Sequence, residues 1–152
     1  MKQRIVSLFF CLSLVTVLAA AALAAGMSAA PTVVTADSIK WAPFPGMKGV
    51  QTAVLFGDPA KAGAEYATRL KLADGVKFPP HTHPRLEEVT VLSGTLVVGV
   101  GSKWDASKMN PLAAGAFAAI PAGLPHFAMS KGVTIIEIHG IGPDVINMVK
   151  TH

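Results

Sequence analysis

Short apolar or alternating runs, each ended by Gly, Pro or Asp, recur through most of the chain after residue 50 and constrain its fold most strongly. Side chains of an extended segment alternate between two faces, so such runs are typical of β-strands. No stretch between them keeps a helical period for three turns, and the best helical candidate is a single turn near 105–109. We therefore predict an antiparallel all-β architecture, as a sandwich or a barrel. The predicted strands cover 51–56, 65–72, 87–92, 95–100, 116–120, 126–129, 133–139 and 145–149.

The N-terminal residues have a different composition from the rest of the chain. Lys2 and Arg4 precede an apolar stretch over 5–23, and Ala22-Leu23-Ala24 fits the A-x-A cleavage pattern. This pattern predicts a cleavable signal peptide over 1–24, and hence a periplasmic or secreted protein without stable membrane insertion after cleavage. The alternative is an uncleaved membrane anchor, because the apolar stretch approaches the roughly 20 residues needed to span a bilayer.

Cysteine usage and charge exclude several classes of function. The single cysteine, Cys11, lies inside the apolar stretch and would leave with the signal peptide, so a cysteine nucleophile is excluded. The remaining chain would carry eleven Lys and Arg against nine Asp and Glu with no basic cluster, so nucleic-acid binding is not indicated. No G-x-S-x-G elbow or complete dinucleotide-binding loop occurs either.

Ala, Pro and Gly dominate residues 25–49, which we predict to form an extended arm. The arm could lie across a sheet or reach a partner subunit, and its Trp41 and Phe44 could cover a barrel edge or form a dimer contact. Residues 50–152 are expected to form one β-barrel domain, because a chain of 152 residues suffices for one ordinary domain and not for two.

Two histidines separated by one residue suggest a metal site. In an extended segment His81 and His83 point to the same face, where two imidazoles can hold one ion. Glu87 shares their odd parity and opens the 87–92 strand, whose Val89 and other odd positions would face the interior. Burying an unpaired carboxylate is costly, and ligation to a divalent cation compensates for that cost. Glu88 has the opposite parity, so we predict Glu87 as the third ligand.

His126 is the predicted fourth ligand, because it opens a strand directly after a Pro and Gly turn that can aim its side chain back into the barrel. Three neutral imidazoles and one carboxylate suit Fe, Mn, Ni, Cu or Zn as a divalent ion, and are too rich in nitrogen for Ca²⁺ or Mg²⁺. An octahedral ion would keep two positions open for water, oxygen or a substrate. The alternatives are a barrel that keeps these residues without a metal and a closed structural zinc site, although the latter usually contains cysteine.

These two stretches resemble the two motifs of the cupin superfamily. Residues 75–94 read G-x5-H-x-H-x3-E-x6-G, and residues 115–126 read G-x5-P-x-G-x2-H, in the family's order and separated by twenty residues. The resemblance implies a double-stranded β-helix, or jelly-roll barrel, over roughly 51–149, with the metal at one end of its cavity. Ser130 stands where the second motif usually has Asn, so a turn contact could differ. The chain also resembles a group of small exported bacterial cupins whose function is generally unassigned.

Three further residues are weaker candidates for a function. Glu88 and His139 are the nearest available acid/base groups, although His139 is more simply interpreted as a surface or core histidine. Arg69 could project toward an anionic substrate or face solvent. Several side chains that flank the motif strands could line an apolar pocket, although packing alone would explain most of them. These side chains are Tyr66, Phe78, Phe117, Phe127 and Met129.

Two functions fit this pattern. The first is a metal-dependent enzyme, for which we favour an oxygenase, because a mixed His/Glu site with open positions could hold Fe(II) with a small organic substrate and O₂. An isomerase, decarboxylase or hydrolase would use the same ligands. The second is a non-catalytic module that senses or stores a small ligand or a metal. By fold analogy alone, a homodimer is also plausible.

Overall fold

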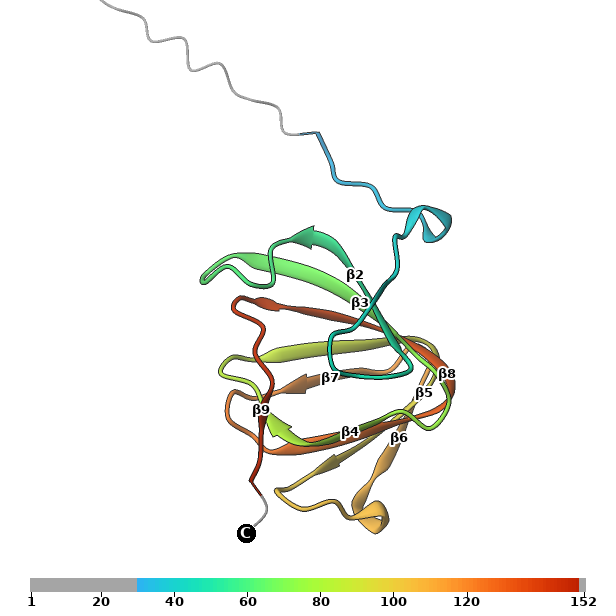
Figure 1. Cartoon of the computed structure of the whole chain (residues 1–152), viewed down its shortest axis with the longest axis vertical. Helices are drawn as coiled ribbons and strands as arrows, with labels where there is room; N and C mark the ends of the chain where they lie inside the picture. Colours follow the sequence, from blue (N-terminus) through green and yellow to red (C-terminus); the bar gives the residue numbers. More distant parts are fainter. Residues whose placement is uncertain (1–29, 151–152) are drawn as a thin grey trace, which may run out of the picture. The chain divides into compact units, whose positions relative to one another are not determined.

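The computed structural model describes residues 30–150, and these residues form an almost entirely β structure (Figure 1). The predicted all-β fold is confirmed. Its two short 3-10 helices are η1 (Ala36–Ser38) and η2 (Ala106–Lys108), the latter inside the predicted helical turn. Its strands are β1 (Ala42–Pro43), β2 (Val50–Gly57), β3 (Glu65–Leu72), β4 (Lys77–Thr82), β5 (Glu87–Val100), β6 (Asn110–Ala113), β7 (Phe117–Ile120), β8 (His126–Ile141) and β9 (Asn147–Met148).

Two long antiparallel strands, β5 and β8, organise the sheet. They pair with each other from Glu88 opposite His139 to Val100 opposite His126, with register shifts near Ser93. β8 also pairs with β3 and β4, and β5 also pairs with β6 and β7. Each long strand therefore lies between the other long strand and two shorter strands. The curled sheet in Figure 1 is the jelly-roll barrel that the motif resemblance implied.

Several predicted strand boundaries are wrong. The predicted strands at 87–92 and 95–100 form one continuous strand, β5, and those at 126–129 and 133–139 form β8. Gly94 and Gly132 lie at these junctions with φ of 75° and 73°, a conformation that glycine adopts without a steric penalty, and the chain bends there without leaving the sheet. The last predicted strand shortens to β9, and β1, β4 and β6 were not predicted.

The core lies between the inward faces of the strands. Along β3 the even-numbered residues from Tyr66 to Leu72 are buried, as are Val89 and Val91 on β5. Burying a side chain of this size contributes about 1.5–3 kcal/mol. The buried cluster comprises Val50, Tyr66, Leu70, Leu72, Phe78, Val89, Val91, Leu96, Ala128, Ile136 and Ile138.

Within the described residues of the predicted arm, only the last part, from Ala42 onward, pairs with the sheet. β1 pairs antiparallel with β2, and the amide of Phe44 donates to the carbonyl of Val50 at 3.0 Å. Phe44 and Met47 pack against the core, whereas Trp41 is half-buried. The predicted signal peptide over 1–24 lies outside the described residues. Within 30–150, no helix has both the length and the apolar character that crossing a membrane requires.

Candidate metal centre

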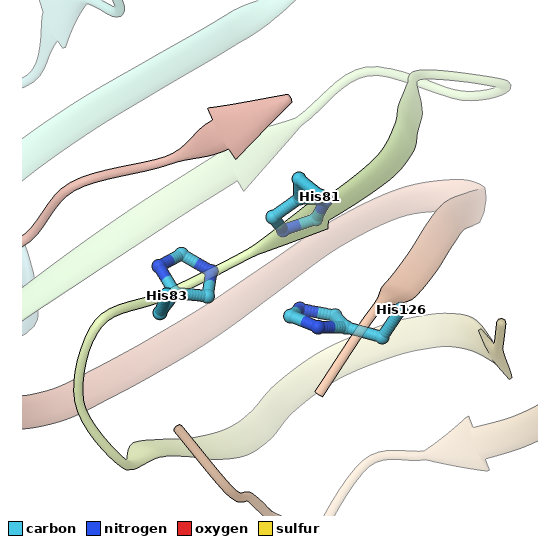
Figure 2. Close-up of side chains that lie close together, drawn as sticks. All are labelled: His81, His83 and His126. Carbon is cyan, nitrogen blue, oxygen red and sulfur yellow. The ribbon is translucent and has the colours of Figure 1, made fainter. Parts of the chain in front are cut away.

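Three buried histidines meet inside the barrel (Figure 2). His81 lies near the end of β4, His83 follows that strand, and His126 is the first residue of β8, directly opposite His81 in the ladder. One ligand atom from each imidazole lies within 4.8 Å of the others, and the residues are only 5%, 7% and 2% exposed. The structure therefore brings together the three histidines that the sequence singled out.

Backbone carbonyls orient two of the imidazoles. His81 Nδ1 lies 2.7 Å from the carbonyl oxygen of Pro79, and His126 Nδ1 lies 3.0 Å from that of Leu124. A carbonyl oxygen can only accept, so each Nδ1 carries the proton and donates it, which leaves each Nε2 with a lone pair. Fixed tautomers of this kind are usual for histidines that bind a metal.

Two buried nitrogens in this cluster have no hydrogen-bond partner, the Nε2 atoms of His83 and His126. Leaving a buried polar atom unpaired costs about 1–3 kcal/mol. A cation would accept both lone pairs and remove that cost. The described residues thus fit a divalent transition metal by the chemistry of their donors, by their burial and by these unpaired nitrogens.

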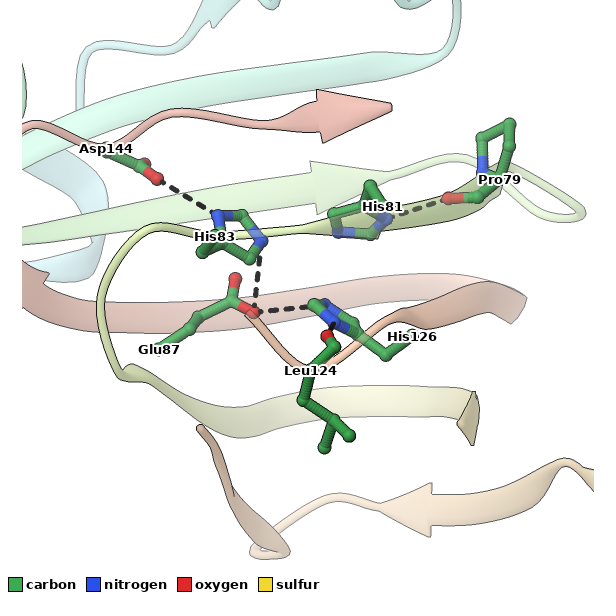
Figure 3. Close-up of polar contacts among 7 residues, drawn as sticks. All are labelled: Pro79, His81, His83, Glu87, Leu124, His126 and Asp144. Carbon is green, nitrogen blue, oxygen red and sulfur yellow. Dashed lines mark hydrogen bonds and ion pairs between the residues drawn. The ribbon is translucent and has the colours of Figure 1, made fainter. Parts of the chain in front are cut away.

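Glu87 faces the same point. Its Oε2 atom lies 3.4 Å from His83 Nε2 and 3.4 Å from His126 Nε2 (Figure 3). Glu87 is 8% exposed, whereas Glu88 is half-buried and pairs in the ladder with His139. The parity argument for Glu87 therefore describes the direction of its side chain correctly.

Burial and mutual contact set the charges within the cluster. Burial, together with the neighbouring imidazoles, lowers the pKa of His81 to about 4, although the contacts with Pro79 and Glu87 oppose this shift. Burial by itself raises the pKa of Glu87, but the close contact with His126 and the positive charge that the imidazoles can carry outweigh burial, and the net pKa is lowered. For His126, burial lowers the pKa, and the interaction with Glu87 outweighs it to give a raised pKa. A carboxylate among neutral imidazoles is the form that binds a cation.

A turn before β8 aims His126 and connects the two motifs. Gly123 has a φ of 74°, and its amide donates to the carbonyl of His83 at 2.8 Å. The amide of Leu124 donates to the carbonyl of Pro121 at 3.1 Å and closes the turn. Gly123 of the second motif thus forms a hydrogen bond to the loop that carries His83 of the first motif.

Asp144, which sequence reasoning missed, also faces the cluster. Its Oδ1 atom lies 3.7 Å from His83 Nδ1, and its side chain is 28% exposed. Burial and the charge of Glu87 raise its pKa, although the charge of His83 and a hydrogen bond with Tyr66 oppose them. The amide of Asp144 donates to the carbonyl of Pro59 at 2.7 Å, which fixes the loop after β8. No motif spacing could have identified this residue, because only the fold brings it close to His83.

The histidines open into a cavity of about 420 Å³ that is lined mainly by apolar side chains. Of the five residues predicted as possible pocket residues, Phe78 lines the cavity and the other four do not. Phe127 is fully buried against Trp104, with ring centroids 5.1 Å apart, and Phe117 is 59% exposed. Strand alternation turns Phe117, Phe127 and Met129 away from the cavity and places Ala118 and Ala128 on its wall. Tyr66 lies in the core without lining the cavity, so packing, the stated alternative, accounts for these residues.

The weaker catalytic candidates lie on the outer face of the barrel. His139 Nε2 is 2.8 Å from Glu137 Oε1, and its side chain is 50% exposed. Arg69 Nε is 2.6 Å from Glu137 Oε2. Glu88 lines an outer depression together with His139. The structure therefore brings none of Arg69, Glu88 and His139 to the histidine cluster. Arg69 pairs with Glu137 in place of an anionic substrate, and its side chain is only 23% exposed.

Ser130, which stands where the second motif usually has Asn, makes turn contacts of its own. Its Oγ atom donates to the carbonyl of Ala73 at 2.6 Å and accepts from the amide of Val76 at 3.0 Å. Ser130 is 1% exposed, so this small hydroxyl ties the turn before β4 to β8 from inside the fold.

Comparisons with known proteins agree with this geometry. Residues 29–136 match the family model of the ChrR cupin-like domain. Germin-like protein 5-1 of Oryza sativa subsp. japonica is 41% identical over 68 residues, which cover 44% of this chain and 31% of that protein. Oxalate oxidase 1 of Hordeum vulgare is 34% identical over 86 residues, which cover 51% of this chain and 43% of the enzyme. The chain thus spans between about a third and two fifths of the length of these curated relatives.

Solved structures extend the likeness to the whole barrel. The acetylacetone dioxygenase from Acinetobacter johnsonii superposes with a TM-score of 0.62 at 16% identity, covering 81% of this chain and 80% of that one. Identity at this level shows a shared fold alone.

Proposed function

The chain belongs to the ChrR cupin-like domain family, and from its site we propose that it is an exported metal-dependent enzyme that oxidises a small organic molecule with O₂. His81, His83, His126 and Glu87 would hold one divalent transition-metal ion. When bound, such an ion supplies Lewis-acid and redox chemistry. Export is proposed from the N-terminal sequence pattern.

The observation that carries this proposal is the pair of unpaired buried nitrogens beside a buried carboxylate. Such an arrangement is unfavourable without a cation and favourable with one. The chain's own residues then have defined tasks. Pro79 and Leu124 hold two imidazoles in one tautomer, Glu87 contributes negative charge, and the apolar walls exclude water from the site.

Oxidation is favoured over the other reactions that the same ligands could serve. Oxalate oxidase 1, which matches this chain over part of the barrel, is an oxidase by name. A mixed His/Glu site leaves positions beside the ion at which O₂ and a substrate can meet. These points support the proposal without identifying the metal or the substrate.

Metal binding is tested by elemental analysis of the exported protein and by chelator competition on His126→Ala. We expect about one equivalent of a transition metal in the native protein and a large loss of affinity in the variant. His139→Ala, on the outer face, is the matched control and should bind as the native protein does. Unchanged affinity in His126→Ala would contradict the assignment of the ligands.

The reaction is tested by oxygen uptake of the metal-loaded protein with a panel of phenols, ketones and oxo-acids. Uptake that depends on both the metal and one compound class is expected. Glu88 and His139, the predicted acid/base candidates, lie outside the cavity, and this observation favours a second function, a non-catalytic ligand-binding module. A metal-loaded protein that binds small molecules and turns over none of the panel would support that function instead.

A further inference from the structure

We propose that the cavity above the histidines takes uncharged, largely apolar small molecules and rejects small carboxylates such as oxalate. This inference deepens the proposed function and rests on it in one respect, that the cavity is the ligand site. It goes against the simplest expectation from the similarity to oxalate oxidase 1, because that expectation would make this chain a binder of a dianion.

The charges around the cavity argue against an anionic ligand. No Lys or Arg is found among the described residues that line the cavity, whereas the two carboxylates Glu87 and Asp144 do line it. Two carboxylates offset the charge of one divalent ion, so an added anion would have no compensating partner in a poorly solvated space. Arg69, the one residue considered as an anion partner, lies on the outer face and pairs with Glu137.

The walls of the cavity are suited to an apolar body. They come from strands on both sides of the barrel and are made of aliphatic and aromatic side chains. Leu70, Phe78, Val89, Leu96, Ile136 and Ile138 are examples, each 7% exposed or less. The ionisable groups are gathered at the histidine cluster, where His83 contacts both Glu87 and Asp144. A ligand with one neutral polar group directed at the cluster and an apolar remainder would meet a matching partner at each position.

The size of the cavity limits the ligand further. Its volume of about 420 Å³ lies toward the lower end of the range of about 300–1,000 Å³ for ligand pockets. An engineered apolar cavity of about 150 Å³ binds benzene. A single substituted ring or a short aliphatic ketone therefore fits this cavity.

The test compares neutral and anionic probes of equal size on the metal-loaded full chain by isothermal titration calorimetry at pH 7.5. The two pairs are benzyl alcohol with benzoate and heptan-2-one with heptanoate, and oxalate is added alone. We expect each neutral probe to bind at least tenfold more tightly than its carboxylate. Equal or tighter binding of the carboxylates or of oxalate would overturn the inference, as would a failure of both neutral probes to bind at millimolar concentration.

Two pairs of variants place the binding in this cavity. Ala118→Leu fills the wall, whereas Ala119→Leu adds the same volume to an exposed neighbour on the same strand. Only the first should weaken binding of the neutral probes, by tenfold or more, and equal effects would refute the location. Val54 lines the cavity and is 53% exposed, so Val54→Lys adds a cation at its edge while Val54→Gln adds a neutral side chain. The lysine variant alone should bind benzoate more tightly.

These outcomes separate the inference from the proposed function. The probes report binding and need no turnover. Selective binding of neutral probes without oxygen uptake would refute the oxidation and leave the inference standing. Oxygen uptake driven by oxalate would support the oxidation and refute the inference.

Discussion

His81 should make the metal-free protein sensitive to acid, and replacing it should remove that sensitivity. His81 is 5% exposed, and burial holds its pKa at about 4, against about 6.5 in the unfolded chain. The folded state therefore binds fewer protons than the unfolded state between these two values. The free energy of unfolding consequently falls as the pH is lowered from about 6.5 to about 4, and this contribution is fully present above pH 6.5.

The difference between the two pKa values corresponds to about 3 kcal/mol of unfolding free energy lost at pH 4. That loss is a large share of the stability of an ordinary domain, about 5–15 kcal/mol. The raised pKa of His126 acts in the opposite direction, since its protonated form is favoured in the folded state. It is present in native protein and variant alike, so the difference between them reports His81 together with its coupling to Glu87 and His126.

The assay is urea unfolding in the presence of a chelator, followed by the fluorescence of Trp41 and Trp104, at pH 7 and pH 4 for native protein and His81→Gln. The native protein should lose about 3 kcal/mol more than the variant. His139→Gln, with a side chain that is 50% exposed, should behave like the native protein. The reasoning would be refuted if His81→Gln and native protein lost the same free energy between the two pH values.

Three further results are expected. Asp144→Asn should lower metal affinity by about 10- to 100-fold in a chelator competition, because it removes the charge that faces His83 Nδ1, while Asp37→Asn on the exposed arm should have no effect. Gly99→Ala should lower the free energy of unfolding by about 1–3 kcal/mol in urea titrations, because a Cβ at this position would overlap the ring of the fully buried Phe127. Arg69→Ala should lower the free energy of unfolding by about 1–3 kcal/mol, because it removes the charged partner of Glu137 from a pair whose side chains are only 23% and 19% exposed, and it should leave metal affinity unchanged.

The site could be predicted from the sequence because its residues follow local rules. His81 and His83 share a face by strand alternation, and Glu87 keeps that parity at the start of β5. His126 follows a turn whose glycine has a positive φ. Alternation and turn chemistry give the direction of each side chain, whereas the meeting of the side chains at one place depends on the pairing of β4 with β8 and on the contact between Gly123 and His83. The resemblance of the two motifs to those of the cupin superfamily supplied that second part.

The errors occurred where the tertiary structure decides the outcome. Glycines at 94 and 132 were interpreted as strand ends, but pairing of β5 with β8 on both sides of each bend keeps the strands continuous. β4 was missed because it contains Pro79 and Pro80, and its ladder skips from Phe78 to His81. Asp144 reaches His83 only through the folding of the loop after β8. Phe127 was considered as a possible pocket residue, although alternation from His126 already directs it away from the cavity and toward Trp104.

The hydrogen bond from the Gly123 amide to the His83 carbonyl makes one backbone proton a sensor of the histidine cluster. This proton can exchange with solvent deuterium only when the two loops separate, and such separation also displaces a ligand of the ion. Its exchange rate should therefore decrease as metal is added, which allows occupancy of the centre to be followed without a substrate, a chromophore or a reaction.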